Sequence, residues 1–309
     1  MATRELHSSP RILPLYLRAA APAVPGASLL PFLGGGGGET PDVELVLRHA
    51  SVDSTRLAGY ARVCGFSTSE TLPATAAHLL AFPLHLALMA DPSFPVGAIG
   101  LIHIANEISQ HRPVAVSEPL DLRVHATALA EHPRGRSFSL ISEARAAGEL
   151  VWEERSTMLR RSATRASGAG SRRDASASES SAAAQVEREW SLPGDLGRRY
   201  GAVSGDRNPI HLHSLTAKPL GFPSAIAHGM WTKARCLAEL DGRLPDAFTV
   251  NVRFRAPIAL PGRVAFASVA DGNAIDFSVR GSWSDATHLQ GRVEPLAGPA
   301  DNDERSRTR

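Results

Sequence analysis

The spacing of apolar residues in the last third of the chain predicts a helix. Between positions 229 and 240, Met230, Ala234 and Leu237 recur at three- and four-residue intervals, which is typical of a helix with one apolar face. Lys233 and Arg235 fall elsewhere on the helical wheel, so the helix is predicted to be amphipathic. Alternation of apolar and polar residues then predicts strands at 248–254, 263–269 and 275–283.

The N-terminal half repeats this order of elements. A helix is predicted at 74–89, followed by strands near 98–106, 120–128, 137–146 and 149–159. In each half, antiparallel strands therefore follow one helix, and a sheet that wraps around that helix would bury both apolar surfaces. This arrangement defines the α+β class.

Shifts in composition divide the chain into five parts. Residues 1–40 end in five consecutive glycines and are predicted to be a flexible N-terminal segment. Residues 162–185 consist mainly of Ser, Ala, Gly and Arg and cannot bury a core, so they are predicted to be a disordered linker. The tail at 298–309 is similarly polar. Two compact halves remain, at 41–161 and 186–297.

The two halves share a pattern of residues. Tyr60, Val63 and Gly65 have the same spacing as Tyr200, Val203 and Gly205, and Arg112-Pro113-Val114 corresponds to Ala256-Pro257-Ile258. However, Phe66 stands where the second half has Asp206, and no Asp-x-Asn-Pro-x-His follows it. The first half is therefore predicted to be non-catalytic and to line part of a pocket, whereas the second half is predicted to supply the catalytic residues of that pocket.

Composition and charge exclude several classes of function. The 309 residues are 43% hydrophobic and 21% charged, with a net charge of only +2, so no nucleic-acid partner is indicated. Polar residues and prolines interrupt the apolar stretches, so neither a membrane span nor a signal peptide is expected. With only Cys64 and Cys236, no disulfide framework is expected, and the cytoplasm is the predicted compartment.

The candidate chemistry lies between Gly205 and His211. Asp206 and His211 stand five residues apart and are the side-chain types best suited to proton transfer near neutral pH. Between them, Asn208-Pro209 restricts the backbone to extended or turn geometry, so the two side chains can converge on one small molecule.

This segment, with Tyr200 before it and His228-Gly229-Met230 after it, resembles the motif of the MaoC-like (R)-specific enoyl-thioester hydratases and 3-hydroxyacyl-thioester dehydratases. The resemblance covers about the last third of the chain. It implies two hotdog folds in tandem, which form a pseudo-dimer within one chain. It also implies reversible conversion of an (R)-3-hydroxyacyl thioester of coenzyme A or acyl carrier protein to the trans-2-enoyl thioester in fatty-acid metabolism. No cofactor or metal is expected, and a homodimer is compatible with this arrangement.

The resemblance also implies roles for individual residues. Asp206 and His211 are the expected catalytic pair, although either of them could be the base. Supporting roles fall to Gly205, Asn208 and Pro209, and Asn208 is expected to hold the aspartate or a water molecule. The N–H of Gly229, at the start of the amphipathic helix, is expected to stabilise the developing oxyanion. Candidates for further contact with the substrate are His228, Tyr200 and Arg207.

Other interpretations of the same residues stay open. Asp206 could be only a turn residue, His228 could only satisfy backbone groups at the helix start, and His211 with His213 could form a metal pair, although no further ligand has a recognised spacing. A hotdog thioesterase, in which water attacks the carbonyl carbon, is the second hypothesis. A non-catalytic protein that binds acyl thioesters is the third.

Overall fold

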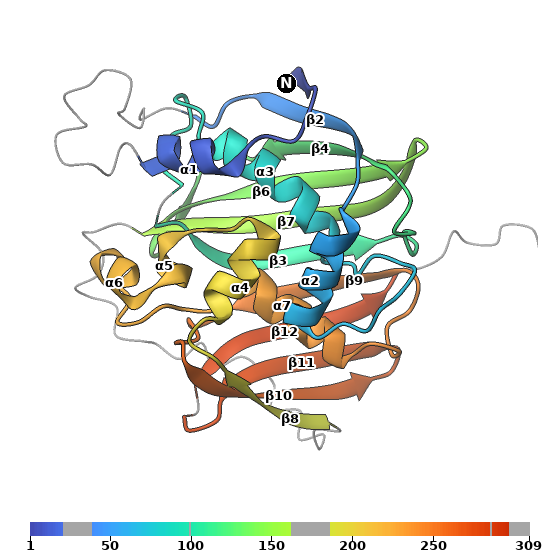
Figure 1. The fold of residues 1–309 in the computed structure, drawn as a ribbon, viewed down its shortest axis with the longest axis vertical. Helices are drawn as coiled ribbons and strands as arrows, with labels where there is room; N and C mark the ends of the chain where they lie inside the picture. Colours follow the sequence, from blue (N-terminus) through green and yellow to red (C-terminus); the bar gives the residue numbers. More distant parts are fainter. Residues whose placement is uncertain (21–38, 99, 162–185, 285, 297–309) are drawn as a thin grey trace, which may run out of the picture.

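The computed structural model describes residues 1–20, 39–98, 100–161, 186–284 and 286–296, and its strands form one continuous sheet (Figure 1). The strands are β1 (Ala2–Leu6), β2 (Val43–Ala50), β3 (Ile102–Gln110), β4 (Leu120–Ala126), β5 (Ala130–His132), β6 (Gly135–Ala146), β7 (Glu149–Arg161), β8 (Val186–Leu192), β9 (Phe248–Phe254), β10 (Gly262–Asp271), β11 (Ala274–Gly281) and β12 (Thr287–Pro295). The helices are α1 (Ile12–Ala20), α2 (Ser54–Cys64), α3 (Ala77–Met89), α4 (Leu196–Ser204), α5 (Pro209–Leu212), α6 (Ser214–Ala217), η4 (Lys218–Leu220) and α7 (Gly229–Glu239).

The strand order shows the internal repeat directly. The first half runs β2-β4-β6-β7-β3 across the sheet, and the second half runs β8-β10-β11-β12-β9 in the corresponding positions. The halves meet where β3 pairs antiparallel with β9, from Ala105 opposite Arg253 to Gln110 opposite Phe248. Helix α3 lies over the first set of strands and α7 over the second (Figure 1). The predicted tandem of two units, in each of which strands wrap around a helix, is confirmed, and the two sets of strands join into one sheet at β3 and β9.

The residue match between the halves corresponds to a match in structure. Helices α2 and α4 each end at a glycine in the left-handed region, Gly65 at φ 86° and Gly205 at φ 85°. An isolated bridge joins Thr71 to Ala115 in the first half, and an equivalent bridge joins Ile226 to Ala259 in the second. The predicted correspondence of segments 112–114 and 256–258 is therefore confirmed by their bridge partners.

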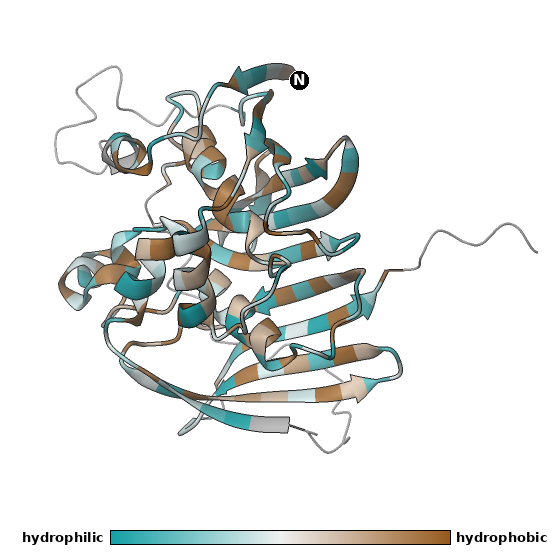
Figure 2. Cartoon of the chain, turned by 45° about the vertical axis from the view of Figure 1, so that its right-hand side comes forward, coloured by the Kyte–Doolittle hydropathy of each residue, from teal (hydrophilic) through white to brown (hydrophobic). Residues whose placement is uncertain are grey.

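The two central helices are buried more completely than their sequences suggest. Along the strands of the second half, hydrophobic and hydrophilic positions alternate (Figure 2), and the apolar set faces the core. Helix α3 is buried on nearly all sides, but no helix in the described part of the chain is long and apolar enough to cross a membrane. Lys233 of α7, expected on a polar face, is 0% exposed. The helical wheel predicted an exposed position, but Lys233 can be buried because its Nζ donates to the carbonyl oxygen of Val250 and to Asn106.

Several boundaries differ from the sequence-based expectation. Residues 1–20 are not a free segment, because β1 pairs in parallel with β2 and α1 packs on the core. Strands β2, β8 and β12 were not predicted, and β3 begins later than expected. The predicted linker at 162–185, the predicted tail at 298–309 and the glycine run at 34–38 lie outside the described residues.

Candidate active site

The loop between α4 and α5 carries Asp206, and α5 itself carries His211, the two predicted catalytic residues. Gly205 ends α4 at φ 85°, and a Cβ there would lie 2.3 Å from Ile12 Cδ1 of α1. Asn208 caps α5, with its side-chain oxygen accepting from Ile210 N–H, and Pro209 occupies the first turn. The segment therefore bends sharply after α4 and turns His211 back toward Asp206.

Asp206 is held through one of its two carboxylate oxygens. Oδ1 accepts hydrogen bonds from the Tyr16 hydroxyl at 2.7 Å and from the Asn208 backbone N–H at 3.0 Å. The other oxygen, Oδ2, lies 3.8 Å from Nε2 of His228. Asn208 thus holds the aspartate as expected, but it does so through its backbone, because its side chain is used to cap α5.

Two imidazole rings face this carboxylate. His211 Nδ1 lies 2.8 Å from the carbonyl oxygen of Ile226, and His228 Nε2 lies 3.0 Å from the carbonyl oxygen of Asp206. A carbonyl oxygen only accepts, so each of these nitrogens carries the proton of its neutral ring. His211 therefore keeps an unprotonated Nε2. The rings stack with centroids 3.7 Å apart, and donor atoms of Asp206, His211 and His228 all lie within 4.8 Å of one another.

Burial and charge give these groups defined ionisation states. Burial raises the pKa of the Asp206 carboxyl, but the two imidazoles and the hydrogen bonds from Tyr16 and Asn208 lower it more, so its pKa lies below 3.8. Burial lowers the pKa of His211 below 6.5, although Asp206 and the Ile226 carbonyl oppose this shift. Burial and the neighbouring His211 lower the pKa of His228 to about 3. At neutral pH the site therefore contains a carboxylate and two neutral imidazoles.

These ionisation states predict the pH dependence of any reaction that needs the site as a base. Because the folded-state pKa of His211 lies below 6.5, His211 stays neutral as the pH falls toward that value and is protonated only below it. We expect kcat/KM of such a reaction to be constant from neutral pH down to this point and to fall at lower pH. A stopped-flow pH series, with circular dichroism at each pH as a control for unfolding, checks this; an acid limb above 6.5 would contradict it.

Helix α7 begins at the edge of the same site. Its first residue is Gly229, and a Cβ at this position would lie 3.0 Å from the ring of Phe254, so a glycine lets the helix start close to β9. Among the described residues, the Gly229 N–H has no backbone acceptor outside the helix. Free N–H groups and the positive end of the helix dipole favour negative charge at this point.

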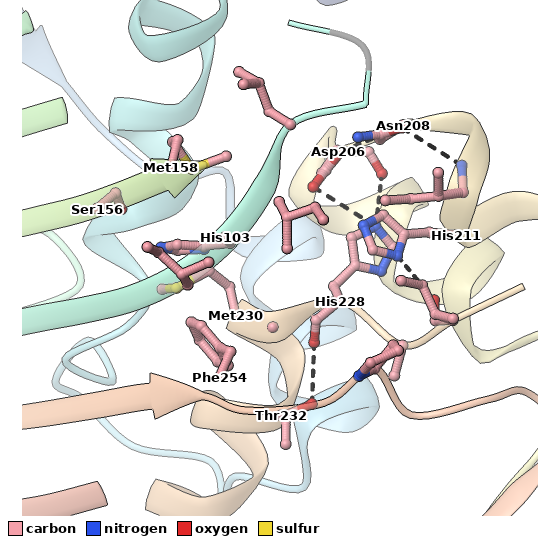
Figure 3. Close-up of a pocket in the computed structure, with 18 of the residues that line it drawn as sticks. His103, Ser156, Met158, Asp206, Asn208, His211, His228, Met230, Thr232 and Phe254 are labelled. Atoms are coloured by element: carbon pink, nitrogen blue, oxygen red, sulfur yellow. Dashed lines mark hydrogen bonds and ion pairs between the residues drawn. The ribbon is translucent and has the colours of Figure 1, made fainter. Parts of the chain in front are cut away.

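One pocket includes the site and is walled by both halves. Of the sequence-predicted residues, Tyr200, Asp206, Asn208, His211, His228 and Gly229 line it, whereas Gly205 and Pro209 support the loop from outside. Across the pocket stand His103, Ser156 and Met158 from β3 and β7 (Figure 3). Phe82 of α3 lines it as well, but Leu79, Leu84 and Leu86 are core residues. The first half therefore lines part of the pocket, although it lacks the Asp-x-Asn-Pro-x-His segment of the second half.

Three polar residues near the site in sequence do not line the pocket. Arg207 is exposed, and its backbone N–H donates to the Tyr16 hydroxyl oxygen at 3.0 Å. His213 caps α6, with its Nδ1 accepting from the Leu215 N–H. Arg235 pairs with Glu239 and lies over the Trp190 ring.

Two parts of the molecule were missed by sequence reasoning. The first is Tyr16, which lies in a segment that was expected to be flexible. The second is a buried polar cluster beside the pocket, in which Glu154 bonds His78 and Asn106, and His85 bonds Ser142. The only sequence signal for this cluster is His78 and His85 at a seven-residue interval in an otherwise apolar helix.

The first half contains a second compact cluster of histidine and carboxylate groups. Donor atoms of His78, His85 and Glu154 also lie within 4.8 Å of one another, as in the Asp206 cluster. His78 Nδ1 lies 2.9 Å from each oxygen of Glu154, which makes a direct ion pair or hydrogen bond. Burial lowers the pKa of His85 to about 3, which leaves it neutral beside Glu154.

The fold therefore consists of two hotdog units, each a sheet wrapped around a helix, with the Asp and His groups in a pocket that both units line. Residues 179–281 match the MaoC like domain. The chain is 33% identical to 3-hydroxyacyl-thioester dehydratase X of Mycobacterium tuberculosis over 94% of its own length and 100% of that protein. The crystal structure of that protein, HtdX, superposes with a TM-score of 0.72 at 31% identity, covering 82% of this chain and 100% of that one. The chain belongs to the MaoC-like dehydratases and is a hydro-lyase.

Two more distant similarities agree with this. A 3-hydroxybutyryl-CoA dehydratase of Methylorubrum extorquens is 38% identical over 65 residues, which are 20% of this chain and 41% of that protein. A second Mycobacterium tuberculosis protein, described as having a double hotdog fold, superposes with a TM-score of 0.52 at 13% identity, over 84% of this chain and 96% of that one. The latter supports the fold alone.

Proposed function

We propose that the protein catalyses reversible hydration of trans-2-enoyl thioesters to (R)-3-hydroxyacyl thioesters, with Asp206 and His211 as its catalytic pair. The observation that supports this most strongly is that a carboxylate oxygen of Asp206 and a ring nitrogen of His211 lie within 4.8 Å of each other in a pocket, with Asp206 ionised and His211 neutral at neutral pH. Two acceptors that each hydrogen-bond one water molecule at about 2.8 Å stand about 4.5 Å apart. The spacing therefore suits a single water molecule between them.

Such a water molecule would donate one hydrogen to the Asp206 carboxylate and the other to Nε2 of His211. Its oxygen lone pair then faces the β-carbon of the enoyl group. As the C–O bond forms, one of the two groups takes a proton from the water. The same proton is then delivered from the same side to the α-carbon, which gives syn addition and returns the group to its starting state. Proton transfer by positioned groups of this kind contributes about 10²–10⁴-fold to the rate.

Negative charge develops on the thioester oxygen during this addition. The Gly229 N–H at the start of α7 is the donor proposed for it, since such donors contribute about 2.7–4 kcal/mol in comparable sites. The acyl chain would extend toward the first half, where Phe82, Leu140 and Met158 line the pocket. Tyr200 and His228 are proposed to contact the substrate from the second half.

Coenzyme A and acyl carrier protein are both proposed as carriers of the acyl group, and a role in fatty-acid metabolism fits either. The cytoplasmic location expected from the cysteine content stays a prediction, as does a homodimeric state. Arg207 does not line the pocket, so no contact of its side chain with the substrate is proposed there.

The test is to present the purified protein with trans-2-enoyl thioesters of several chain lengths on both carriers. We expect loss of the absorbance of the conjugated enoyl group without release of a free thiol, and regain of that absorbance from (R)-3-hydroxyacyl thioesters. Stoichiometric thiol release would identify a thioesterase instead. Binding of the thioester with neither change would identify a non-catalytic protein.

A further inference from the structure

Helix α1 packs against the active-site loop with one face. Ile12, Leu15 and Tyr16 lie three and four residues apart and are partly buried against the core, whereas Leu13 on the other side is 66% exposed. Ile12 lies against Gly205, the residue before Asp206. The helix is thus docked by apolar contacts at the point where the catalytic loop begins, and this contact directs the Tyr16 hydroxyl into the loop.

The Tyr16 hydroxyl makes two hydrogen bonds to consecutive residues of that loop. It donates to Asp206 Oδ1 at 2.7 Å and accepts from the Arg207 N–H at 3.0 Å. The same Oδ1 accepts from Asn208 N–H at 3.0 Å. With two donors on Oδ1, the carboxylate cannot rotate about its Cβ–Cγ bond without breaking both, so Oδ2 stays turned toward the imidazoles.

We propose that Tyr16 is a positioning residue that fixes the Asp206 carboxylate in its reactive orientation, so that a helix far from the motif in sequence completes the active site. This proposal rests on the proposed catalytic role of Asp206. The Arg207 N–H fixes the hydroxyl oxygen in turn, and therefore the hydroxyl hydrogen has one direction available to it, toward Oδ1.

The charges around Asp206 agree with this role. The facing groups are His211 from α5, His228 at the start of α7 and Tyr200 from α4, and the Arg56 guanidinium of α2 donates to the carbonyls of Val203 and Ser204 nearby. Burial and the Asp206 carboxylate raise the pKa of Tyr16 far above its ordinary value. Tyr16 therefore remains a donor throughout the working pH range and cannot itself be the base.

The test compares Tyr16→Phe with the wild type in the full-length chain. Loss of a hydrogen bond to a charged group predicts a kcat about 10- to 100-fold lower, while KM changes little because Tyr16 does not line the pocket. Leu13→Ala, on the exposed face of the same helix, is the matched control and is expected to keep the wild-type kcat. An unchanged kcat in Tyr16→Phe would overturn the proposal.

A double-mutant cycle with Asp206→Asn separates positioning from a merely structural role. If Tyr16 acts through Asp206, Tyr16→Phe lowers the residual rate of Asp206→Asn much less than it lowers that of the wild type. An equal loss in both backgrounds would show that Tyr16 acts elsewhere. A readout that needs no activity is a ¹³C titration of the Asp206 carboxyl, whose pKa should rise in Tyr16→Phe; an unchanged pKa would overturn the proposal even if the protein hydrated no thioester.

Discussion

Replacing Asp206 with asparagine should lower kcat for enoyl-thioester hydration by about 10²–10⁴-fold while leaving the fold intact. The asparagine side chain has the same shape, and its oxygen can still accept from Tyr16 and from the Asn208 N–H. It carries no charge and cannot take a proton from water at neutral pH. The loss should therefore fall on the chemical step, and single-turnover measurements of enoyl absorbance will show it.

The control for this change is Asp195→Asn, which makes the same substitution one helix earlier. Asp195 precedes α4, and its side chain makes no capping hydrogen bond, so this variant should turn over like the wild type. Thermal unfolding of both variants should match that of the parent. Normal turnover by Asp206→Asn would remove this residue from the catalytic pair, whatever the behaviour of His211.

Replacing Glu154 with leucine should lower the free energy of unfolding by about 3–5 kcal/mol, the cost of breaking a buried ion pair from one side. The Glu154 side chain is 0% exposed, and it accepts from His78 at 2.9 Å and from Asn106 Nδ2 at 2.7 Å. Asn106 in turn accepts from Lys233, whose pKa burial lowers to about 7. A leucine would leave His78 Nδ1 and one of the two hydrogens of Asn106 Nδ2 without an acceptor, while Ser156 Oγ still accepts the other hydrogen.

Urea denaturation at neutral pH measures this loss, with Glu153→Leu as the neighbouring control. Glu153 is 43% exposed and pairs with His111, so its removal should cost under about 1 kcal/mol. Burial raises the pKa of Glu154, but His78, His85 and Asn106 lower it far more, to well below 4.5. The stabilisation by ionised Glu154 is therefore fully present above pH 4.5 and is lost as the pH falls through the folded-state pKa. The difference in free energy of unfolding between Glu154→Leu and the wild type should therefore shrink in acid. A constant difference would contradict this.

The parts of the site that could be read from the sequence are local ones. Asp206, Asn208 and His211 belong to one seven-residue segment, so their spacing alone predicts that they converge. The helix at 229–240 was predicted from its periodicity, and Gly229 is its first residue in the structure. The tandem fold was also predictable, because each half carries a helix followed by strands with clear alternation.

What could not be predicted depends on contacts between segments that are distant in sequence. Tyr16 meets Asp206 across 190 positions, and nothing in the composition of residues 1–20 indicates that a helix docks there. Lys233 was assigned to a polar face because a helical wheel cannot show that Asn106 and Val250 of neighbouring strands offer it acceptors. Glu154 alternates with its neighbours as any strand residue does, so its burial was not evident.

The pairing of β3 with β9 has a consequence for how this molecule can change. When two identical subunits associate, every substitution is present in both of them. A change that alters the pocket lining in one subunit therefore also alters the same position beside the catalytic residues of the other. Here the two halves are parts of a single polypeptide, so a substitution in one half leaves the other half unchanged. The half without the Asp-x-Asn-Pro-x-His segment can therefore change its pocket wall while that segment in the other half stays the same.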